Sequence, residues 1–372
     1  MAKLKDSLIL KLILGVIVGL VVGLYSNETV IGLVNTIKFL LGQVISFTIP
    51  LIILGFIAPA ITSSVGAALM SMVAGYTLIP MLNITSAADS AKKVIPELIF
   101  KVEIPPAMSV MTALVLAIFV GLAVVWTNSK NFENVLVEFG NIMLAIVTRV
   151  VIPILPLFVA TTFATLSYEG VILKQFPVFL KVIVIVLIGH YIWLALLYTI
   201  GGIVNKCNPM DVLRYYGPAY LTAVGTMSSA ATLPIALSCA RKSPVLKEEI
   251  VNFGVPLGAT VHLCGSVLTE VFFVMTVSKI LYGTIPSFGT MILFIILLGV
   301  FAVGAPGVPG GTVMASLGII ISVLGFDEAG VGLMLTIFAL QDSFGTACNV
   351  TGDGALTMIL NGLFKDEVGT AK

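Results

Sequence analysis

The chain has 372 residues, of which 59% are hydrophobic and 10% are charged, whereas soluble domains have about 45–50% and about 25%. This excludes an ordinary soluble protein, and apolar runs near twenty residues predict a polytopic helical membrane protein surrounded by lipid. Because 19 basic and 18 acidic residues nearly cancel to a net charge of +1, we expect no nucleic acid partner.

Two regions of the chain differ in pattern. The first contains largely uninterrupted apolar runs, which predict membrane helices over 7–25, 38–61, 64–83, 106–127, 135–165 and 176–203. In the second, from about 212 to 365, Gly, Pro, Ser and Thr repeatedly interrupt the apolar sequence. Backbone groups freed at membrane depth must be satisfied by protein or water, so these breaks predict a region that lines a cavity.

Two of the interrupted segments are built alike. Residues 220–234 divide at a Ser/Thr-rich turn, and residues 301–312 divide at a Gly/Pro-rich turn. Each arm around the second turn has about a dozen residues, or roughly 18 Å of helix, which is too short for an apolar core of about 30 Å. The pair predicts re-entrant hairpins at a transporter binding site, and two kinked full-length helices are the alternative.

The distribution of Lys and Arg predicts cytoplasmic termini in a plasma (inner) membrane. With both ends inside, most basic residues between the spans fall on the cytoplasmic side, as the positive-inside rule prefers. The basic residues at 92, 93, 101 and 174 would lie outside.

The last apolar span carries a polar stripe. Its members, Asp342, Thr346, Asn349 and Asp353, are spaced four, three and four residues apart. On a helix this spacing places them within an arc of about 60°. Carboxylate, amide and hydroxyl oxygens suit both an alkali cation and the amino group of a zwitterion. The alternative is a hydrogen-bonded seam between helices.

A second polar set precedes it. His262, Ser266 and Glu270 recur every fourth residue, and Gly258 and Gly265 bracket a stretch that we expect to unwind and offer carbonyl oxygens. Buried carboxylates in membranes are functional candidates, and His262 and Glu270 are candidates for moving protons. The alternative is a packed histidine and a glutamate paired with a hydroxyl.

Four motifs occur in order: Ser228-Ser229 with Thr232-Leu233-Pro234, Pro256-Leu257-Gly258-Ala259-Thr260, Gly307-Val308-Pro309-Gly310, and Asn349-Val350-Thr351-Gly352-Asp353. Together they resemble the dicarboxylate/amino acid:cation symporter family, which includes sodium-coupled glutamate and aspartate transporters. The resemblance implies an all-α membrane protein with eight transmembrane helices and two re-entrant hairpins. It also implies a homotrimer in which a transport domain moves like an elevator against a scaffold.

The resemblance further implies a division of the chain. Residues 1–210 would form mainly scaffold and trimerisation helices, with the third helix belonging to the transport domain, and 211–372 would form the transport-domain core. The core would comprise hairpin 1 at about 212–241, helix 7 at about 248–282, hairpin 2 at about 288–325 and helix 8 at about 328–365.

Roles at single positions also follow from the resemblance. Ser229, with Ser228 beside it, and Asn349 would hold the α-carboxylate of an amino acid. The backbone of Gly307 and Val308 would close over it. Helix N-termini in the hairpins would favour this anion.

The same resemblance assigns Asp342 to the α-amino group and Thr346 to a hydroxyl contact. Transporters of acidic amino acids in this family place an arginine where Gly345 or Met227 stands here. Without a guanidinium a second carboxylate lacks its bidentate partner. Gly345 leaves space for a larger side chain, so we expect a neutral amino acid.

For the coupling cation, the resemblance implies one sodium site at Asp353, Asn349 and carbonyls near Gly258, and a second at Thr260 with hairpin 2. The family's Asn-Met-Asp signature is His262-Leu263-Cys264 here. This removes an amide and a carboxylate, so at least one sodium site should be weakened or absent.

Two further comparisons concern protons and the third helix. Glu270 aligns with a proton-carrying glutamate of the animal glutamate transporters, which makes proton coupling a serious option. The spans 38–61 and 64–83 meet at 61–65 with almost no connection, so third-helix ion ligands cannot be assigned from the sequence.

The sequence therefore predicts a symporter that moves a small amino acid with Na⁺ or H⁺ and has no organic cofactor. An ion channel lined by the hairpins is the alternative. A hydrolase or metal site built on His262 and Cys264 lacks a third catalytic group or ligand in the neighbouring sequence, so we do not expect an enzyme.

Overall fold

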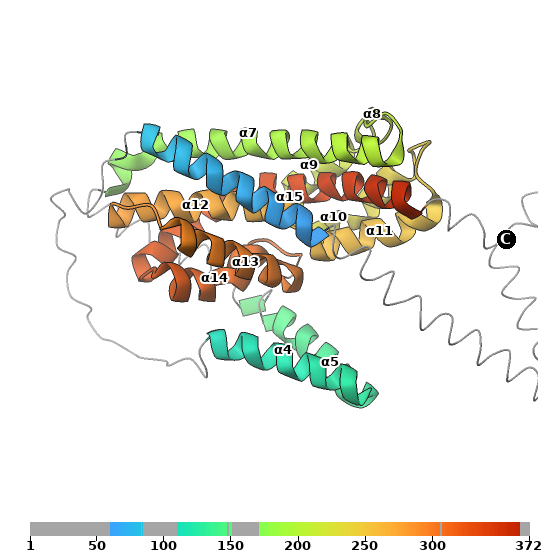
Figure 1. Cartoon of the computed structure of the whole chain (residues 1–372), viewed down its shortest axis with the longest axis horizontal. Helices are drawn as coiled ribbons and strands as arrows, with labels where there is room; N and C mark the ends of the chain where they lie inside the picture. The colour runs from blue at the N-terminus through green and yellow to red at the C-terminus, as the bar shows by residue number, and fades with distance from the viewer. Residues whose placement is uncertain are drawn as a thin grey trace, which may run out of the picture. The chain divides into compact units, whose positions relative to one another are not determined.

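The computed structural model describes residues 60–82, 84, 110–146, 149–150, 171–305 and 307–364. Within these ranges the regular elements are helices, without strands (Figure 1). In the described part of the chain, four helices are long and apolar enough to cross a membrane: Ala60–Leu82, Pro177–Asn205, Glu248–Tyr282 and Ala329–Phe364. The span predicted at 7–25 lies outside the described residues, as do all but the last two residues of 38–61 and most of 135–165.

The helix Ala60–Leu82 ends in the 3-10 turn η1 (Ile79–Leu82). The helices that follow are α4 (Val110–Thr127), α5 (Lys130–Ile146), α7 (Val171–Asn205), α8 (Met210–Leu213), α9 (Gly217–Thr226), α10 (Ser229–Ala240), α11 (Glu248–Val261), α12 (Cys264–Tyr282), α13 (Phe288–Gly304), α14 (Gly311–Leu324) and α15 (Glu328–Phe364).

Residues 61–65, expected as a short connection between two spans, are helical and continue into the helix Ala60–Leu82. The apolar pattern places a boundary there because Thr62, Ser63 and Ser64 interrupt it. Ser63 and Ser64 are buried, and hydroxyls inside a helix bundle are tolerated when they reach partners on other helices.

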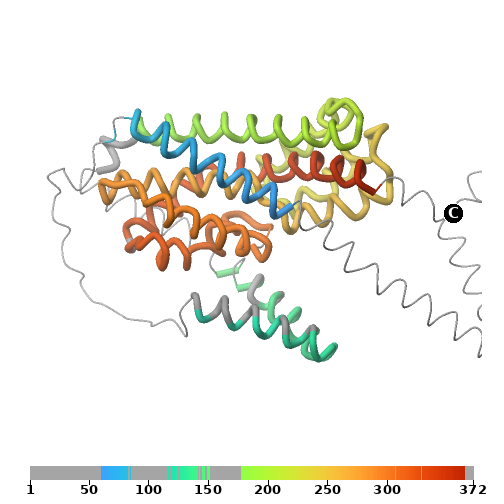
Figure 2. The backbone as a smooth tube through the Cα atoms, viewed as in Figure 1, coloured from blue at the N-terminus to red at the C-terminus, as the bar shows by residue number. Residues whose placement is uncertain are grey.

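Helix α15 packs against α7, α9, α10, α11 and α12 (Figures 1 and 2). Small residues on α15 allow this close approach. A Cβ added at Gly354 would lie 2.6 Å from the Tyr198 hydroxyl oxygen, and one at Gly362 would lie 2.7 Å from backbone atoms of Asn205. Helix α7 belongs to residues 1–210, expected to be mainly scaffold, and it lies directly on α15 of the expected transport-domain core.

Helices α9 and α10 form the first hairpin, and Met227 makes its turn in the left-handed conformation (φ 50°). Ser228 caps α10, since its side chain accepts a hydrogen bond from the Ala231 N–H. The hydroxyls of Thr226 and Thr232 lie 3.0 Å apart and close the turn.

Helices α13 and α14, of 17 and 14 residues, form the second hairpin. Its turn is shorter than the predicted 301–312, because α13 continues to Gly304 and α14 begins directly after Gly310. Gly310 has φ +70°, a conformation that glycine adopts without steric cost. The apolar residues 301–303 therefore belong to the first arm.

Helices α11 and α12 are one apolar segment broken at His262 and Leu263. His262 has extended backbone dihedrals (φ −109°, ψ 99°), and α12 restarts at Cys264. The unwinding expected between Gly258 and Gly265 is confirmed. The break leaves the first N–H groups of α12 in the buried core, where they need acceptors.

We predict that Gly362→Ala destabilises the protein by about 1–3 kcal/mol, because the added methyl overlaps the α7 backbone and forces two packed helices apart. The measurement is thermal unfolding of the purified protein in detergent. Gly289→Ala on α13 is the matched control, since no atom lies within 4 Å of its added Cβ. Equal melting temperatures for the two variants would contradict the close contact between α7 and α15.

Candidate functional site

The amide of Asn349 on α15 holds the start of α12. Its Oδ1 accepts hydrogen bonds from the N–H groups of Gly265 (2.8 Å) and Ser266 (3.2 Å), and its Nδ2 donates to Ser266 Oγ (2.8 Å). The side chain is buried. In this conformation Asn349, expected to bind substrate and cation, satisfies the N–H groups that the helix break exposes.

Asp342, two turns earlier on α15, accepts a backbone N–H at the start of the second arm of the second hairpin. Its Oδ2 accepts the Gly310 N–H at 2.7 Å, directly before α14 begins. A carboxylate at a helix N-terminus is stabilised by the helix dipole as well as by the hydrogen bond. Thr346 lies buried on the same face of α15.

The tips of the two hairpins touch each other. Ser228 Oγ donates to the Gly307 carbonyl at 2.6 Å, and the Ala230 N–H reaches the same oxygen at 3.5 Å. Ser229 is buried as the first residue of α10, whereas Val308 is half-buried. The predicted carboxylate-binding residues of the hairpins therefore lie at one junction.

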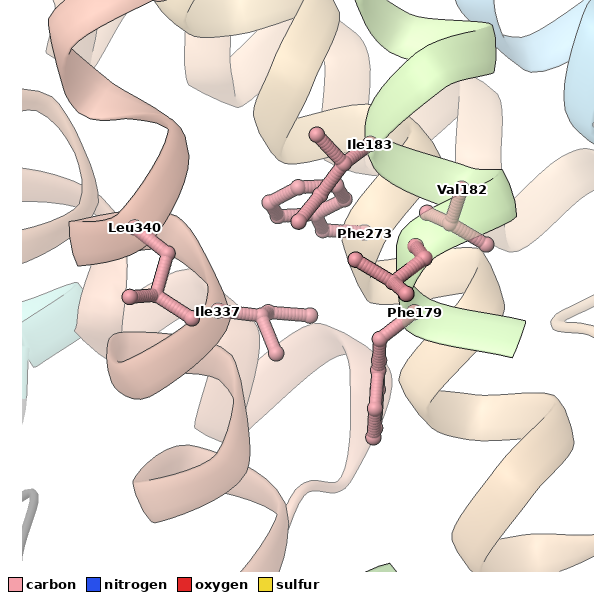
Figure 3. Close-up of a pocket in the computed structure, with 7 residues that line it drawn as sticks. Phe179, Val182, Ile183, Phe273, Ile337 and Leu340 are labelled. Carbon is pink, nitrogen blue, oxygen red and sulfur yellow. The ribbon is translucent and has the colours of Figure 1, made fainter. Parts of the chain in front are cut away.

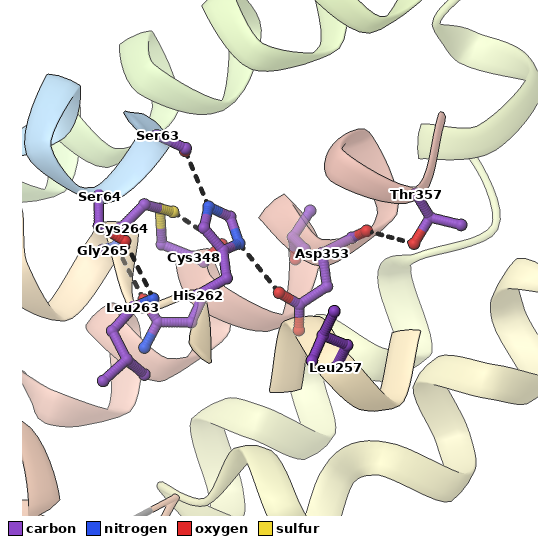
Figure 4. Close-up of polar contacts among 12 residues, drawn as sticks. Ser63, Ser64, Leu257, His262, Leu263, Cys264, Gly265, Cys348, Asp353 and Thr357 are labelled. Carbon is purple, nitrogen blue, oxygen red and sulfur yellow. Dashed lines mark hydrogen bonds and ion pairs between the residues drawn. The ribbon is translucent and has the colours of Figure 1, made fainter. Parts of the chain in front are cut away.

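The imidazole of His262 lies between two helices (Figure 4). Its Nδ1 is 2.9 Å from Asp353 Oδ1 on α15, and its Nε2 is 2.8 Å from the hydroxyl of Ser63. Ser64 Oγ accepts the Leu263 N–H at 3.3 Å. The helix break is thus tied to α15 on one side and to the helix Ala60–Leu82 on the other.

The surroundings of the Asp353 carboxylate are tightly packed. A Cβ added at Gly258 would lie 2.7 Å from Asp353 Oδ1, and one at Gly352 would lie 2.9 Å from Cε1 of His262. The side chains of His262 and Asp353 are at most 1% exposed. Asp353 Oδ2 has no hydrogen-bond partner.

Glu270 faces the second hairpin. One of its carboxylate oxygens accepts a hydrogen bond from Ser316 on α14, and the other has no hydrogen-bond partner. His262, Ser266 and Glu270 do not share one helix face, because the break lies between His262 and Ser266. Ser266 instead contacts α15 through Asn349, while Glu270 contacts α14.

Two predicted site residues, Thr260 and Gly345, make other contacts than those expected. Thr260 is on the exposed side of α11, and its hydroxyl donates to the Leu257 carbonyl at 2.7 Å. Gly345 is buried against α12, where an added Cβ would be 3.4 Å from Cα of Ser266. The space expected beside Gly345 is therefore bounded by the first turn of α12.

Comparison with known proteins identifies the family. The model of the sodium:dicarboxylate symporter family matches residues 62–363. The chain belongs to this family. The expected resemblance is thus confirmed.

Similar proteins include excitatory amino acid transporter 2 of Homo sapiens, 25% identical over 79% of this chain and 51% of that protein. The Mus musculus protein of the same name is 27% identical over the same shares. An excitatory amino acid transporter of Caenorhabditis elegans is 30% identical over 41% of this chain and 30% of its own length. The chain spans about half the length of the first two relatives. The family and these relatives are transporters, not enzymes.

Three residues at these contacts were left unassigned in the sequence analysis. Ser63 and Ser64 reach the helix break from the helix Ala60–Leu82, and Ser316 reaches Glu270 from α14. Each partner lies between 46 and 199 residues away along the chain. A hydroxyl pair inside an apolar helix was the available signal for Ser63 and Ser64.

An apolar pocket of about 110 Å³ opens elsewhere, between α7, α12 and α15 (Figure 3). Its lining consists of Phe179, Leu180, Val182, Ile183, Phe273, Ile337 and Leu340. It offers no partner to a charged amino acid backbone. Among the described residues, no group of three or more His, Cys, Asp or Glu side chains is arranged to hold a metal ion.

We predict that Asn349→Ala lowers stability by about 2 kcal/mol, because two buried N–H groups of α12 lose their acceptor. The measurement is thermal unfolding in detergent without amino acid. Asn208→Ala is the control, since the exposed Asn208 side chain also accepts a backbone N–H (3.0 Å). If Asn349→Ala and Asn208→Ala cost the same, the proposed cap is not significant.

Proposed function

We propose that the chain is a secondary active symporter that moves a small amino acid, neutral rather than acidic, together with a cation. The observation that carries the proposal is the buried Asp342 carboxylate facing the tip of the second hairpin. Membership of a symporter family supports the cation coupling. The proposal includes the elevator mechanism, a homotrimer and cytoplasmic termini.

The chemistry of binding begins at Asp342. A substrate ammonium group carries three N–H donors and a full charge, whereas the Gly310 N–H that now occupies Asp342 carries one neutral donor. Charge-assisted hydrogen bonds are about twice as strong as neutral ones. We propose that the ammonium group replaces the Gly310 N–H and that the hairpin tip then rearranges around the bound molecule.

The α-carboxylate would bind where helices begin. α10 and α14 start at the junction of the two tips, and helix N-termini favour anions. Ser228 and Ser229 supply hydroxyls there. Because Ser228 Oγ now donates to the Gly307 carbonyl, this contact between the hairpins must break when the carboxylate takes the hydroxyl.

Preference for a neutral side chain follows from the charges available. Helices α9, α10, α13, α14 and α15 contain no Lys or Arg. A second substrate carboxylate buried at their junction would lack a cationic partner, and an unpaired buried charge is strongly unfavourable. We therefore propose a substrate with one carboxylate and one amino group.

Coupling would act through the broken helix. Asp353, His262 and Glu270 are buried titratable groups that connect α15, the break and the second hairpin. A site neutralised by its cation crosses lipid at far lower cost than a charged one. An ion channel is the competing function, and exchange of substrate across liposome membranes separates the two because a channel gives no counterflow.

We predict that Asp342→Asn abolishes amino acid binding while the protein stays folded. The amide oxygen can still accept the Gly310 N–H, but the charge that pairs with an ammonium group is lost. Thermal shift with a panel of neutral amino acids measures binding, because a ligand that binds the folded state stabilises it.

Asp327→Asn is the matched control, since this exposed carboxylate lies just before α15 begins and accepts hydrogen bonds from Tyr282 and Gly330 rather than from the hairpin tip. It should leave the amino acid response unchanged. An Asp342→Asn protein that binds as tightly as the wild type would remove Asp342 from the site.

We predict that wild-type protein responds to neutral amino acids and not to aspartate, and that Met227→Arg creates an aspartate response. Met227 lies at the tip of the first hairpin, so an arginine at this position would supply the guanidinium partner that a second substrate carboxylate lacks. Leu221→Arg adds the same charge on the exposed face of α9 and serves as control. A strong aspartate response of the wild type would contradict the neutral substrate.

A further inference from the structure

We infer that His262 takes the place of a sodium ion at Asp353, so that this carboxylate is paired by an imidazole of the protein itself. The family name implies sodium as the coupling ion, and the sequence motifs suggested Asp353, Asn349 and Gly258 as ligands. The inference concerns the coupling ion, and it rests on the proposed function only in taking cation coupling from it.

The first step concerns the oxygens. Hard cations are held by several oxygen ligands acting together. Asp353 Oδ1 receives a hydrogen bond from His262 Nδ1, because an ionised carboxylate can only accept. Asn349 Oδ1 accepts two N–H groups of α12. Of these side-chain oxygens, only Asp353 Oδ2 lacks a hydrogen-bond partner.

The second step concerns space. The ring of His262 lies against α15, with Cε1 within 2.9 Å of a Cβ added at Gly352. On the other side the carboxylate lies against Gly258, where an added Cβ would be 2.7 Å from Oδ1. The imidazole therefore lies beside the carboxylate, between Ser63 and Asp353, as Figure 4 shows.

The third step concerns how the ring is fixed. Nε2 is 2.8 Å from the Ser63 hydroxyl, which can donate to the ring or accept from it. With both nitrogens engaged, the ring cannot rotate out of the gap without losing two buried hydrogen bonds. His262 joins three helical segments in the way that a cation with ligands on all three would join them.

The consequence is an ion-specificity role for His262. A side chain attached to the chain cannot be exchanged with the solution, so while the ring stays in place Asp353 offers sodium only Oδ2, and a single oxygen is too few ligands for a hard cation. Sodium stabilisation that depends on Asp353 is therefore absent in the wild type, and a residue with a smaller side chain at 262 uncovers it.

The test is a double-mutant cycle on the purified full chain in detergent at fixed pH. Melting temperatures are measured in NaCl and in choline chloride of equal ionic strength, without amino acid. For each protein, the sodium shift is the melting temperature in NaCl minus that in choline chloride. Adding Asp353→Asn to the wild type should leave this shift unchanged. Adding it to His262→Asn should lower the shift by several degrees, because the ion that stabilises the folded state then loses its carboxylate ligand.

A second measurement is the binding of radioactive Na⁺ to the wild type and to His262→Asn, in which only the variant should gain binding. It does not require the Asp353 variant to fold. Ser64→Ala is the control, since it removes a hydroxyl at the same break that contacts Leu263 rather than the imidazole. It should gain no sodium response.

An Asp353-dependent sodium shift in the wild type would overturn the inference. A folded His262→Asn protein that gains neither a shift nor Na⁺ binding would also overturn it. The amino acid panel is run on the same samples. A response that requires Asp342 leaves the proposed symport standing even if the sodium result contradicts His262.

Discussion

The constraint on which the structure depends is that helices begin inside the apolar core. Helices α10, α12 and α14 all start at buried residues, and the first N–H groups of a helix have no partner within it. In an apolar core each unsatisfied group costs several kcal/mol. The acceptors come from Ser228 for α10, Asn349 for α12 and Asp342 for α14.

Two of these acceptors lie on the polar stripe of α15, which holds the breaks in place in the present conformation. In the proposed function the same groups also bind the amino acid, so that binding exchanges internal partners for substrate groups. Such an exchange would couple occupancy of the site to the position of the second hairpin tip, because the Gly310 N–H is the partner that is displaced.

The sequence predicted the local features well and the long-range ones poorly. The spacing of Asp342, Asn349 and Asp353 on one helix and the unwinding near His262 follow from periodicity and glycine placement. The pairing of His262 with both Asp353 and Ser63 does not, because its partners are 91 and 199 residues away. The packing of α15 on one side of the break and of the helix Ala60–Leu82 on the other brings them together.

The second hairpin shows the same limit. Its Gly/Pro-rich turn was readable from the sequence, but the turn is narrower than the pattern because residues 301–303 continue the helix. Thr260 was assigned from the family motif, yet its side chain points to the exposed side of α11. A motif fixes which residues are present, whereas the helix phase around a break decides which side each one faces.

The claim that the hairpin tips and the polar stripe of α15 form one amino acid site is tested most directly by hydrogen–deuterium exchange. The exchange is measured by mass spectrometry with and without a stabilising amino acid. The account predicts altered exchange in peptides covering 226–231 and 307–312, with no change around α8. Unchanged exchange at both tips, in the presence of an amino acid that measurably stabilises the protein, would contradict it.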